Sequence, residues 1–189
     1  MSVDGFIAGP AVTPDQPLGQ GGERLHDWLF VNTTTDDRRV VAELLETSGA
    51  VILGSWTYAV AIETVWEYSS PFLFPAFVLC REGPVVETEG FTFVTGGIGN
   101  ALAEARNAAM GKNVWVMGGA HTTQQFLRAG LLDELHIHIA PLLLARGTRL
   151  FEDFGRNQID LRKLKVVTTP ASSRWRRTSV SVVPSRWAS

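Results

Sequence analysis

The sequence predicts an α/β protein whose sheet is mainly parallel and closes with an antiparallel edge. Short apolar runs alternate with helix-period segments over most of the chain, which is typical of parallel strands joined by helices. Several of these runs end at glycine directly before a helix. After residue 130 strand patterns follow one another, which favours antiparallel pairing at the end of the chain.

Composition indicates one ordinary globular domain over residues 1–189. The chain is 45% hydrophobic and 19% charged, and its net charge is 17 − 19 = −2. No basic surplus favours nucleic acid or an anionic membrane, and no apolar run approaches the ~20 residues of a membrane span. The single cysteine, Cys80, excludes an internal disulfide. With Asp4 interrupting the start and no signal-peptide pattern, we expect a cytoplasmic protein.

The stretch from Asn113 to Gly130 is the centre of the prediction. Val114–Met117 is an apolar strand, Gly118-Gly119 ends it, and Ala120–Leu127 has helical periodicity. Glycine lets a ligand approach the backbone, and a helix start offers free N–H groups. The unit therefore suits a phosphate or pyrophosphate. The alternative is a tight strand-to-helix turn that binds nothing.

The preceding chain predicts a long loop, helices and three more strands. The loop over Gly9–Gly22 is long enough, at about 14 residues, to favour a lid or binding loop. Leu25–Phe30 forms a helical turn. Thr35 or Asp36 caps a helix containing Val40 to Leu45, and Ser55 caps another after a Gly54-terminated strand. The strands span Ala50–Leu53, Ala76–Cys80 and Phe91–Val94, and the last leads through Gly96-Gly97 into a helix.

The C-terminal third predicts strands and no metal site. Leu135–Ile139 alternates apolar residues with polar ones, and two further strands are expected over Leu161–Thr168 and Thr178–Val183. His136 and His138 point to one strand face, but no third ligand is visible, so core or interface histidines are the better interpretation.

Four segments, in order, resemble the dihydrofolate reductase-like proteins. They are Ser2–Gly9 (SVDGFIAG), Gly54–Tyr58 (GSWTY), Val116–Leu127 (VMGGAHTTQQFL) and Asp133–Phe151. The last resembles the bacterial branch related to the reductase domain of riboflavin biosynthesis, and the similarity covers residues 1–168. It implies a three-layer α/β/α fold around a central mixed sheet. It also implies NADPH, a hydride transfer to a small pteridine- or pyrimidinone-like heterocycle, and a homodimer paired through edge strands.

The resemblance also implies the site residues. Asp4 matches the acidic loop residue beside the substrate and is the catalytic candidate, the alternative being a turn residue that binds its own backbone. The implied cofactor-binding residues are Ile7 and Ala8 near the nicotinamide; Gly54, Ser55, Trp56 and Thr57 at one phosphate-facing turn; Cys80 and Arg81 near the adenosine ribose; and Gly118, Gly119, Ala120, His121 and Thr122 at the pyrophosphate.

Two departures qualify these expectations. The family's arginine after Gly54, which pairs with the 2′-phosphate, is Ser55 here, so Arg81 substitutes for it or NADH is accepted. The buried helix carboxylate of true dihydrofolate reductases has no firm match, because Asp36 and Asp37 read as helix-capping acids. A non-catalytic nucleotide-binding protein and a flavin binder on the same fold therefore remain alternatives.

The start of the sequence carries one more expectation. In the family the SVDG loop follows a central apolar strand that lies between the strands carrying the two cofactor turns. Here Met1 directly precedes Ser2. A missing central strand would leave its neighbours' backbone groups unpaired, at about 1–3 kcal/mol each. We therefore expect the natural start some ten residues upstream.

Overall fold

The computed structural model describes residues 1–83, 88–152, 158–170 and 176–184. The chain divides into two compact units. Unit 1 contains residues 1–11, 18–40 and 126–189, and unit 2 contains residues 12–17 and 41–125. None of the helices in the described ranges is long and apolar enough to cross a membrane.

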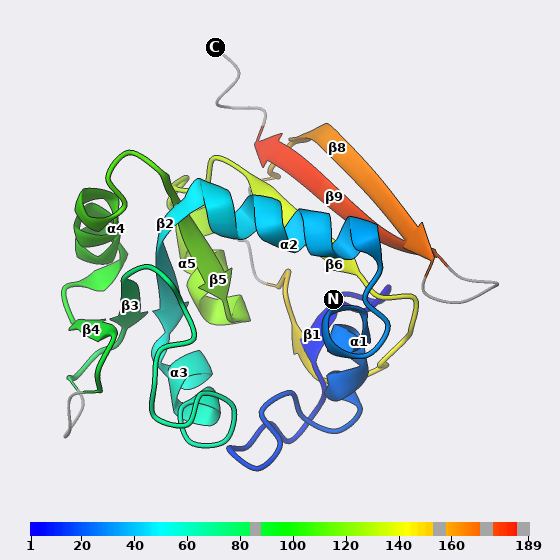
Figure 1. Ribbon diagram of the computed structural model, residues 1–189, viewed down its shortest axis with the longest axis horizontal. Helices are drawn as coiled ribbons and strands as arrows, with labels where there is room; N and C mark the ends of the chain where they lie inside the picture. Colours follow the sequence, from blue (N-terminus) through cyan, green and yellow to red (C-terminus); the bar gives the residue numbers. More distant parts are fainter. Residues whose placement is uncertain (84–87, 153–157, 171–175, 185–189) are drawn as a thin grey trace. The chain divides into compact units, whose positions relative to one another are not determined.

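Unit 2 is built on a parallel sheet of four strands in the order β4-β3-β2-β5 (Figure 1). The strands are β2 (Ser48–Gly54), β3 (Ala76–Leu79), β4 (Phe91–Val94) and β5 (Asn113–Gly118). Each is short and largely apolar; β2 and β3 are mostly buried, whereas most residues of β4 and β5 are only partly buried. The strands expected from the sequence in this region are confirmed to within a few residues at each end.

Helices follow three of these strands directly. α3 (Ser55–Ala61) follows β2, α4 (Gly97–Ala108) follows β4, and α5 (Ala120–Arg128) follows β5. α4 packs against the sheet through Ala101, Leu102 and Ala105, which are buried. Small alanine side chains let the helix lie close to the strands, which accounts for the alanine-rich apolar face.

The other face of this sheet is covered mainly by aromatic side chains. Val51, Leu53, Ala76 and Val78 alternate along β2 and β3 and form a buried cluster. Tyr58 and the segment that leads into β3 supply many of the covering rings, and edge-to-face or stacked pairs hold them together. The partly buried residues packed on the cluster are Tyr58, Trp66, Phe72, Phe74, Phe91, Phe93, Trp115 and Met117.

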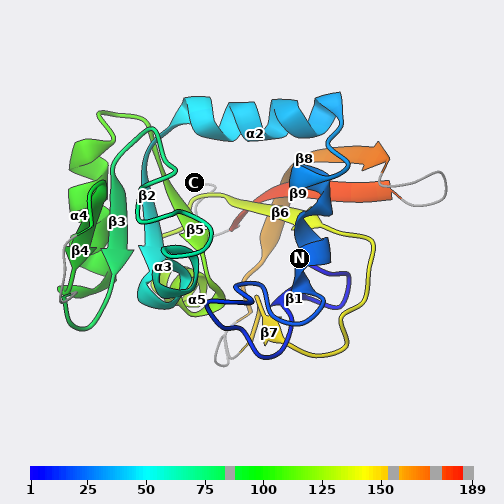
Figure 2. The same ribbon diagram turned by 60° about the horizontal axis from the view of Figure 1, so that its bottom comes forward.

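Unit 1 carries an antiparallel sheet of three strands in the order β6-β9-β8 (Figure 2). They are β6 (Leu135–Ile139), β8 (Leu161–Pro170) and β9 (Arg176–Pro184). A separate two-stranded sheet pairs β1 (Phe6–Ala8) with β7 (Thr148–Arg149). η1 (Gly22–His26) and α1 (Asp27–Phe30) confirm the helical turn expected over Leu25–Phe30. The antiparallel closing strands are thus confirmed.

α2 (Thr35–Thr47) begins in unit 1 with a capping box. The Asp37 carboxylate accepts hydrogen bonds from the Thr34 N–H and hydroxyl at 2.9 and 2.7 Å, and Asp37 N–H donates to Thr34 Oγ1 at 3.2 Å. Thr169 Oγ1 donates to the other Asp37 oxygen at 3.1 Å. The capping role expected for Asp37 is confirmed.

Three local expectations are wrong. The capping hydroxyl of α2 comes from Thr34 rather than from Thr35 or Asp36, because Thr35 is already helical. Ser55 does not cap α3: Gly54 is the N-cap and no side chain caps it. The position expected for the absent strand, between the strands that carry the two cofactor turns, is also wrong, because β2 and β5 are hydrogen-bonded neighbours.

Candidate functional site

The four parallel strands of unit 2 end in line. Leu53 pairs with Gly118, Gly54 with Leu79, and Leu79 with Val94, so the carboxyl ends form one row across the sheet. Ligands of open α/β sheets bind outside this edge. The turns after β2, β3 and β5 hold every cofactor residue that the sequence assigned to unit 2.

The turn between β5 and α5 is built around Gly118 and Gly119. Gly118 is buried with a φ of +122°, and its peptide bond to Gly119 is cis. A side chain is disfavoured at Gly118 by this backbone conformation. A Cβ on Gly119 would lie 3.3 Å from Thr57 Oγ1, which is a tight contact. The turn therefore has no side chain at either position, and the Thr57 hydroxyl lies where a Gly119 side chain would begin.

Thr57, in the first turn of α3, holds this turn by a hydrogen bond. Its hydroxyl oxygen accepts a hydrogen bond from the Gly119 N–H at 2.9 Å, and the two residues are 62 positions apart in the chain. The bond links the first turn of α3 to the start of α5. It makes the two glycine turns one structural unit.

Gly54 and Thr122 make a second contact between the same two turns. A Cβ on Gly54 would lie 2.4 Å from Thr122 Oγ1, closer than real Cβ contacts allow. Gly54 and Thr122 are both buried. The glycine is therefore required so that the Thr122 side chain can lie against the backbone of the β2–α3 turn.

The remaining unit 2 candidates differ in exposure. Ser55, His121 and Arg81 are exposed and Ala120 is buried, while Trp56 exposes 61% of its surface. Ser55 directly follows Gly54, and Arg81 lies two residues after Leu79; Gly54 and Leu79 are the paired ends of β2 and β3. Either side chain is thus available to a ligand at this edge.

Cys80 has a structural environment. Its N–H and Sγ both point to the Val94 carbonyl, at 3.1 and 3.7 Å. Burial raises the pKa of the thiol, and the hydrogen bond to Val94 offsets only part of this effect. A thiol with a raised pKa is a poor nucleophile. The role of Cys80 is therefore structural: its contacts with Val94 join the ends of β3 and β4.

A third glycine turn lies at this sheet edge and was not among the predicted site residues. Gly96 and Gly97 follow β4 and open α4, and Val94 lies in the same row of strand ends as Gly54 and Gly118. Their Gly-Gly pattern matches that of Gly118-Gly119 and was the signal available. The Asn100 side chain covers Gly96, because a Cβ there would lie 2.0 Å from Asn100 Nδ2.

Asp4 lies in a hydrogen-bonded loop of unit 1. Its carboxylate accepts from the N–H groups of Leu144 at 3.1 Å and Ala145 at 2.8 Å, and its carbonyl accepts from Arg149 at 3.0 Å. The Ser2 hydroxyl, ahead of these backbone N–H groups, lowers the pKa of Asp4 below 3.8. Asp4 is therefore ionised at neutral pH and ties its loop to the segment before β7.

Ile7 and Ala8 lie on β1, close to two glycines. A Cβ on Gly147 would lie 2.1 Å from the Ala8 carbonyl oxygen, and Gly9 N–H donates to Leu18 O at 2.8 Å. Both nicotinamide candidates are half-buried. The base of the Gly9–Gly22 loop is thus closed by backbone contacts.

His136 and His138 contact other side chains of the protein. His136 contacts Glu134 at 3.1 Å, and His138 stacks on Trp28 with ring centroids 4.7 Å apart. The described ranges contain no group of three side chains able to hold a metal ion. His26 has a lowered pKa, chiefly because of burial, and its Nδ1 has no hydrogen-bond partner among the described residues.

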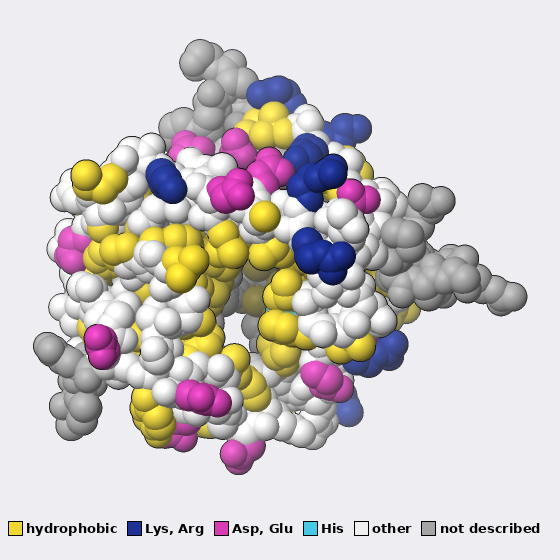
Figure 3. Space-filling model, in the orientation of Figure 1, with side chains coloured by type: hydrophobic (Ala, Val, Ile, Leu, Met, Phe, Trp, Pro, Cys, Tyr) yellow, Lys and Arg dark blue, Asp and Glu magenta, His cyan; other side chains and the backbone are white. Residues whose placement is uncertain are grey.

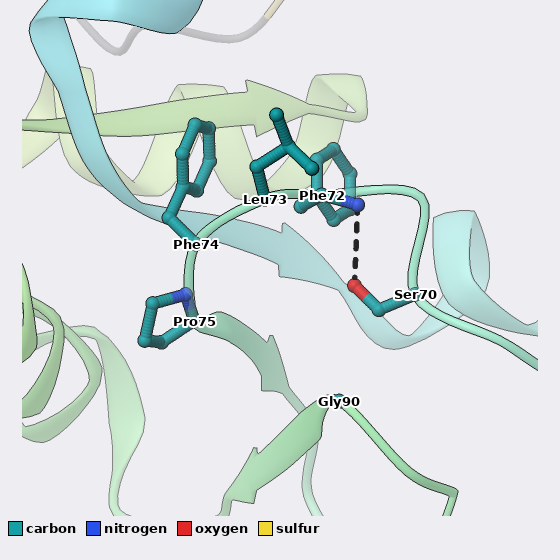
Figure 4. Close-up of a pocket in the computed structure, with 6 residues that line it drawn as sticks. All are labelled: Ser70, Phe72, Leu73, Phe74, Pro75 and Gly90. Carbon is teal, nitrogen blue, oxygen red and sulfur yellow. Dashed lines mark hydrogen bonds between the residues drawn. The ribbon is translucent and has the colours of Figure 1, made fainter.

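A pocket of about 300 Å³ lies elsewhere in unit 2 (Figure 4). It is lined by Ser70, Phe72, Leu73, Phe74, Pro75 and Gly90, none of which belongs to the glycine turns. Ser70 Oγ accepts from the Phe72 N–H at 3.3 Å. Hydrophobic side chains also reach the surface (Figure 3), and Leu73 is 96% exposed.

Comparison with known proteins supports the resemblance. Residues 87–173 match the RibD C-terminal domain. The chain is 27% identical over 138 residues to the uncharacterized protein YwjB of Bacillus subtilis, covering 72% of this chain and 76% of YwjB. It is 36% identical over 58 residues to YyaP of the same organism, covering 31% of this chain and 30% of YyaP.

Two solved structures share the fold. A candidate riboflavin biosynthesis protein from Shewanella sp. PV-4 is 25% identical with a TM-score of 0.72, over 98% of this chain and 96% of that chain. Dihydrofolate reductase from Enterococcus faecalis, complexed with NADP(H), is 15% identical with a TM-score of 0.55, over 78% of this chain and 82% of that chain. The dihydrofolate reductase-like fold and the likeness to the RibD C-terminal domain are therefore established.

Proposed function

We propose that this chain is an NADPH-dependent reductase. Its dihydrofolate reductase-like fold and its match to the RibD C-terminal domain over residues 87–173 support the proposal. Its substrate would be a small heterocycle of the pteridine or pyrimidinone class. The observation that carries the proposal is the Thr57–Gly119 hydrogen bond of 2.9 Å. It holds two glycine turns together at the sheet edge where ligands of this architecture bind.

The residues of this edge fit a dinucleotide. Gly118 and Gly119 leave their backbone without side chains, and the start of the nine-residue helix α5 lies directly behind them. The first-turn N–H groups of α5 would hold the pyrophosphate, helped by the helix dipole. Arg81 would pair with a 2′-phosphate in place of the arginine that Ser55 replaces.

The chain's own groups would position the reactants. When bound, the reduced nicotinamide supplies the hydride, so the protein needs only to hold and orient both molecules. Ile7 and Ala8 would pack beside the nicotinamide. The Asp4 carboxylate has lone pairs beyond the backbone bonds it accepts and could still receive a substrate N–H. The proton donor would be water.

Calorimetric titration tests the cofactor. We expect NADPH to bind with a micromolar dissociation constant, about −8 kcal/mol, and Arg81→Gln to reduce the preference for NADPH over NADH. Gly119→Val should abolish binding while the variant still melts cooperatively, because a side chain there would block the close approach of the cofactor to the backbone. Its Cβ would also meet Thr57 Oγ1 at 3.3 Å. Absence of binding by both dinucleotides at millimolar concentration would refute the proposal.

A second candidate is a nucleotide-binding protein without catalysis. Asp4 favours it, since both carboxylate oxygens already accept backbone N–H groups. Loss of the reduced-nicotinamide absorbance with a panel of pteridines and pyrimidinones distinguishes the two. Tight NADPH binding with no oxidation across the panel would favour the binding protein.

A further inference from the structure

Trp56 differs from the other tryptophans in the described part of the chain. Trp66 and Trp115 contact phenylalanine rings, and Trp28 stacks on His138. Trp56 makes no ring contact among the described residues and is 61% exposed. A large apolar ring left in water forgoes the free energy of burial, so a ligand that covers it would recover that energy.

The position of Trp56 restricts which ligand could cover it. It is the second residue of α3, between Ser55 and Thr57, and Thr57 is hydrogen-bonded to Gly119. The ring is therefore attached to a helical turn that a hydrogen bond joins to the Gly118-Gly119 turn. It is not on a loose surface segment.

The strand order gives the ligand's direction across this edge. β2, which precedes Trp56, lies between β5 and β3 in the order β4-β3-β2-β5. In the proposed function the pyrophosphate lies at the Gly118-Gly119 turn after β5, and Arg81 after β3 meets the 2′-phosphate. The adenosine half must then cross the end of β2, over a span of about two strand spacings, or ~10 Å.

We propose that the Trp56 indole is a stacking platform for the adenine ring of the dinucleotide. The inference rests on the proposed function and adds to it the residue that recognises the adenosine half. Purine–indole stacking needs only the flat faces of the two rings. It would give affinity at a turn where Ser55 has removed the usual arginine.

The test uses the full chain and three probes in calorimetric titrations: NADPH, adenosine 2′,5′-bisphosphate and reduced nicotinamide mononucleotide. Trp56→Leu should weaken the first two about tenfold, as expected for loss of one base–aromatic stack. It should leave the mononucleotide unchanged, and Trp56→Phe should retain most of the affinity. Tyr68→Leu is the matched control, because Tyr68 is 62% exposed in the same unit.

The outcomes separate this inference from the proposed function. If wild-type protein binds NADPH but Trp56→Leu binds the bisphosphate equally well, the stacking role is wrong and the reductase proposal stands. An equal loss in Tyr68→Leu, or an equal loss for the mononucleotide, also overturns the stacking role. If wild-type protein binds neither NADPH nor NADH, both proposals fail together.

Discussion

Replacing Thr57 with valine tests the link between the two glycine turns. Valine has nearly the shape of threonine but no hydroxyl, so the Gly119 N–H loses the acceptor it now meets at 2.9 Å. A buried donor left without a partner costs about 1–3 kcal/mol. Gly119 is only half-buried, so we expect the lower part of this range, about 1–2 kcal/mol.

That loss is large enough to measure in two ways. For a chain of this size 1 kcal/mol shifts the melting temperature by about 2–4 °C, so Thr57→Val should melt about 2–8 °C lower. The cofactor would also have to reorder the loosened turn. If the whole 1–2 kcal/mol is transferred to binding, the dissociation constant for NADPH rises about five- to thirtyfold.

Two control variants make the measurement specific. Thr57→Ser keeps the hydroxyl and should stay within about 0.5 kcal/mol of wild type. Thr92→Val makes the same chemical change on β4, where the side chain is exposed, and should also have little effect. If Thr57→Val has the same melting temperature as Thr57→Ser and binds NADPH as tightly, the hydrogen bond does not hold the turns together and the reasoning is refuted.

Further predictions concern glycines, pH and assembly. Gly54→Ala should lower the melting temperature, because its Cβ would lie 2.4 Å from Thr122 Oγ1. Gly99→Ala in α4 should instead stabilise the protein by about 0.5–1 kcal/mol, because no atom lies within 4 Å of the added Cβ. Equal shifts of the two melting temperatures in differential scanning calorimetry would contradict this. The pKa of Asp4 is lowered from 3.8, so the ionised carboxylate stabilises the fold above pH 3.8, and that contribution is lost as the pH falls through the lower folded-state pKa. Asp4→Ala should therefore melt at a lower temperature than wild type at pH 7. If the difference in melting temperature persists unchanged at the acid end of a pH series, the charge of Asp4 is not responsible. Light scattering should give a homodimer, twice the chain mass of 20.7 kDa, and a single mass near 20.7 kDa at micromolar concentration would contradict it.

Local patterns in the sequence determined most of the helices and strands. Val114–Met117 and Ala50–Leu53 could be recognised as strands because apolar runs ended by glycine reflect short-range backbone preferences. The two-residue alternation of Leu135–Ile139 identified β6 for the same reason. The glycine turns were also visible, since a missing side chain can be read directly from the sequence.

The sequence determined the first residues of the helices less well. Thr34 rather than Thr35 caps α2, and Gly54 rather than Ser55 is the N-cap of α3. Neighbouring residues of similar capping propensity compete, and the packing of the rest of the helix decides between them. The sequence narrowed the choice to one or two positions but did not select one.

Only the tertiary structure decided which distant groups meet. Thr57 and Gly119 are 62 residues apart, and Asp4 binds the N–H of Leu144 140 residues away. The direct pairing of β2 with β5 likewise contradicted an expectation based on family order. Such contacts depend on strand order and register, which long-range packing and hydrogen bonding set and which no local pattern encodes.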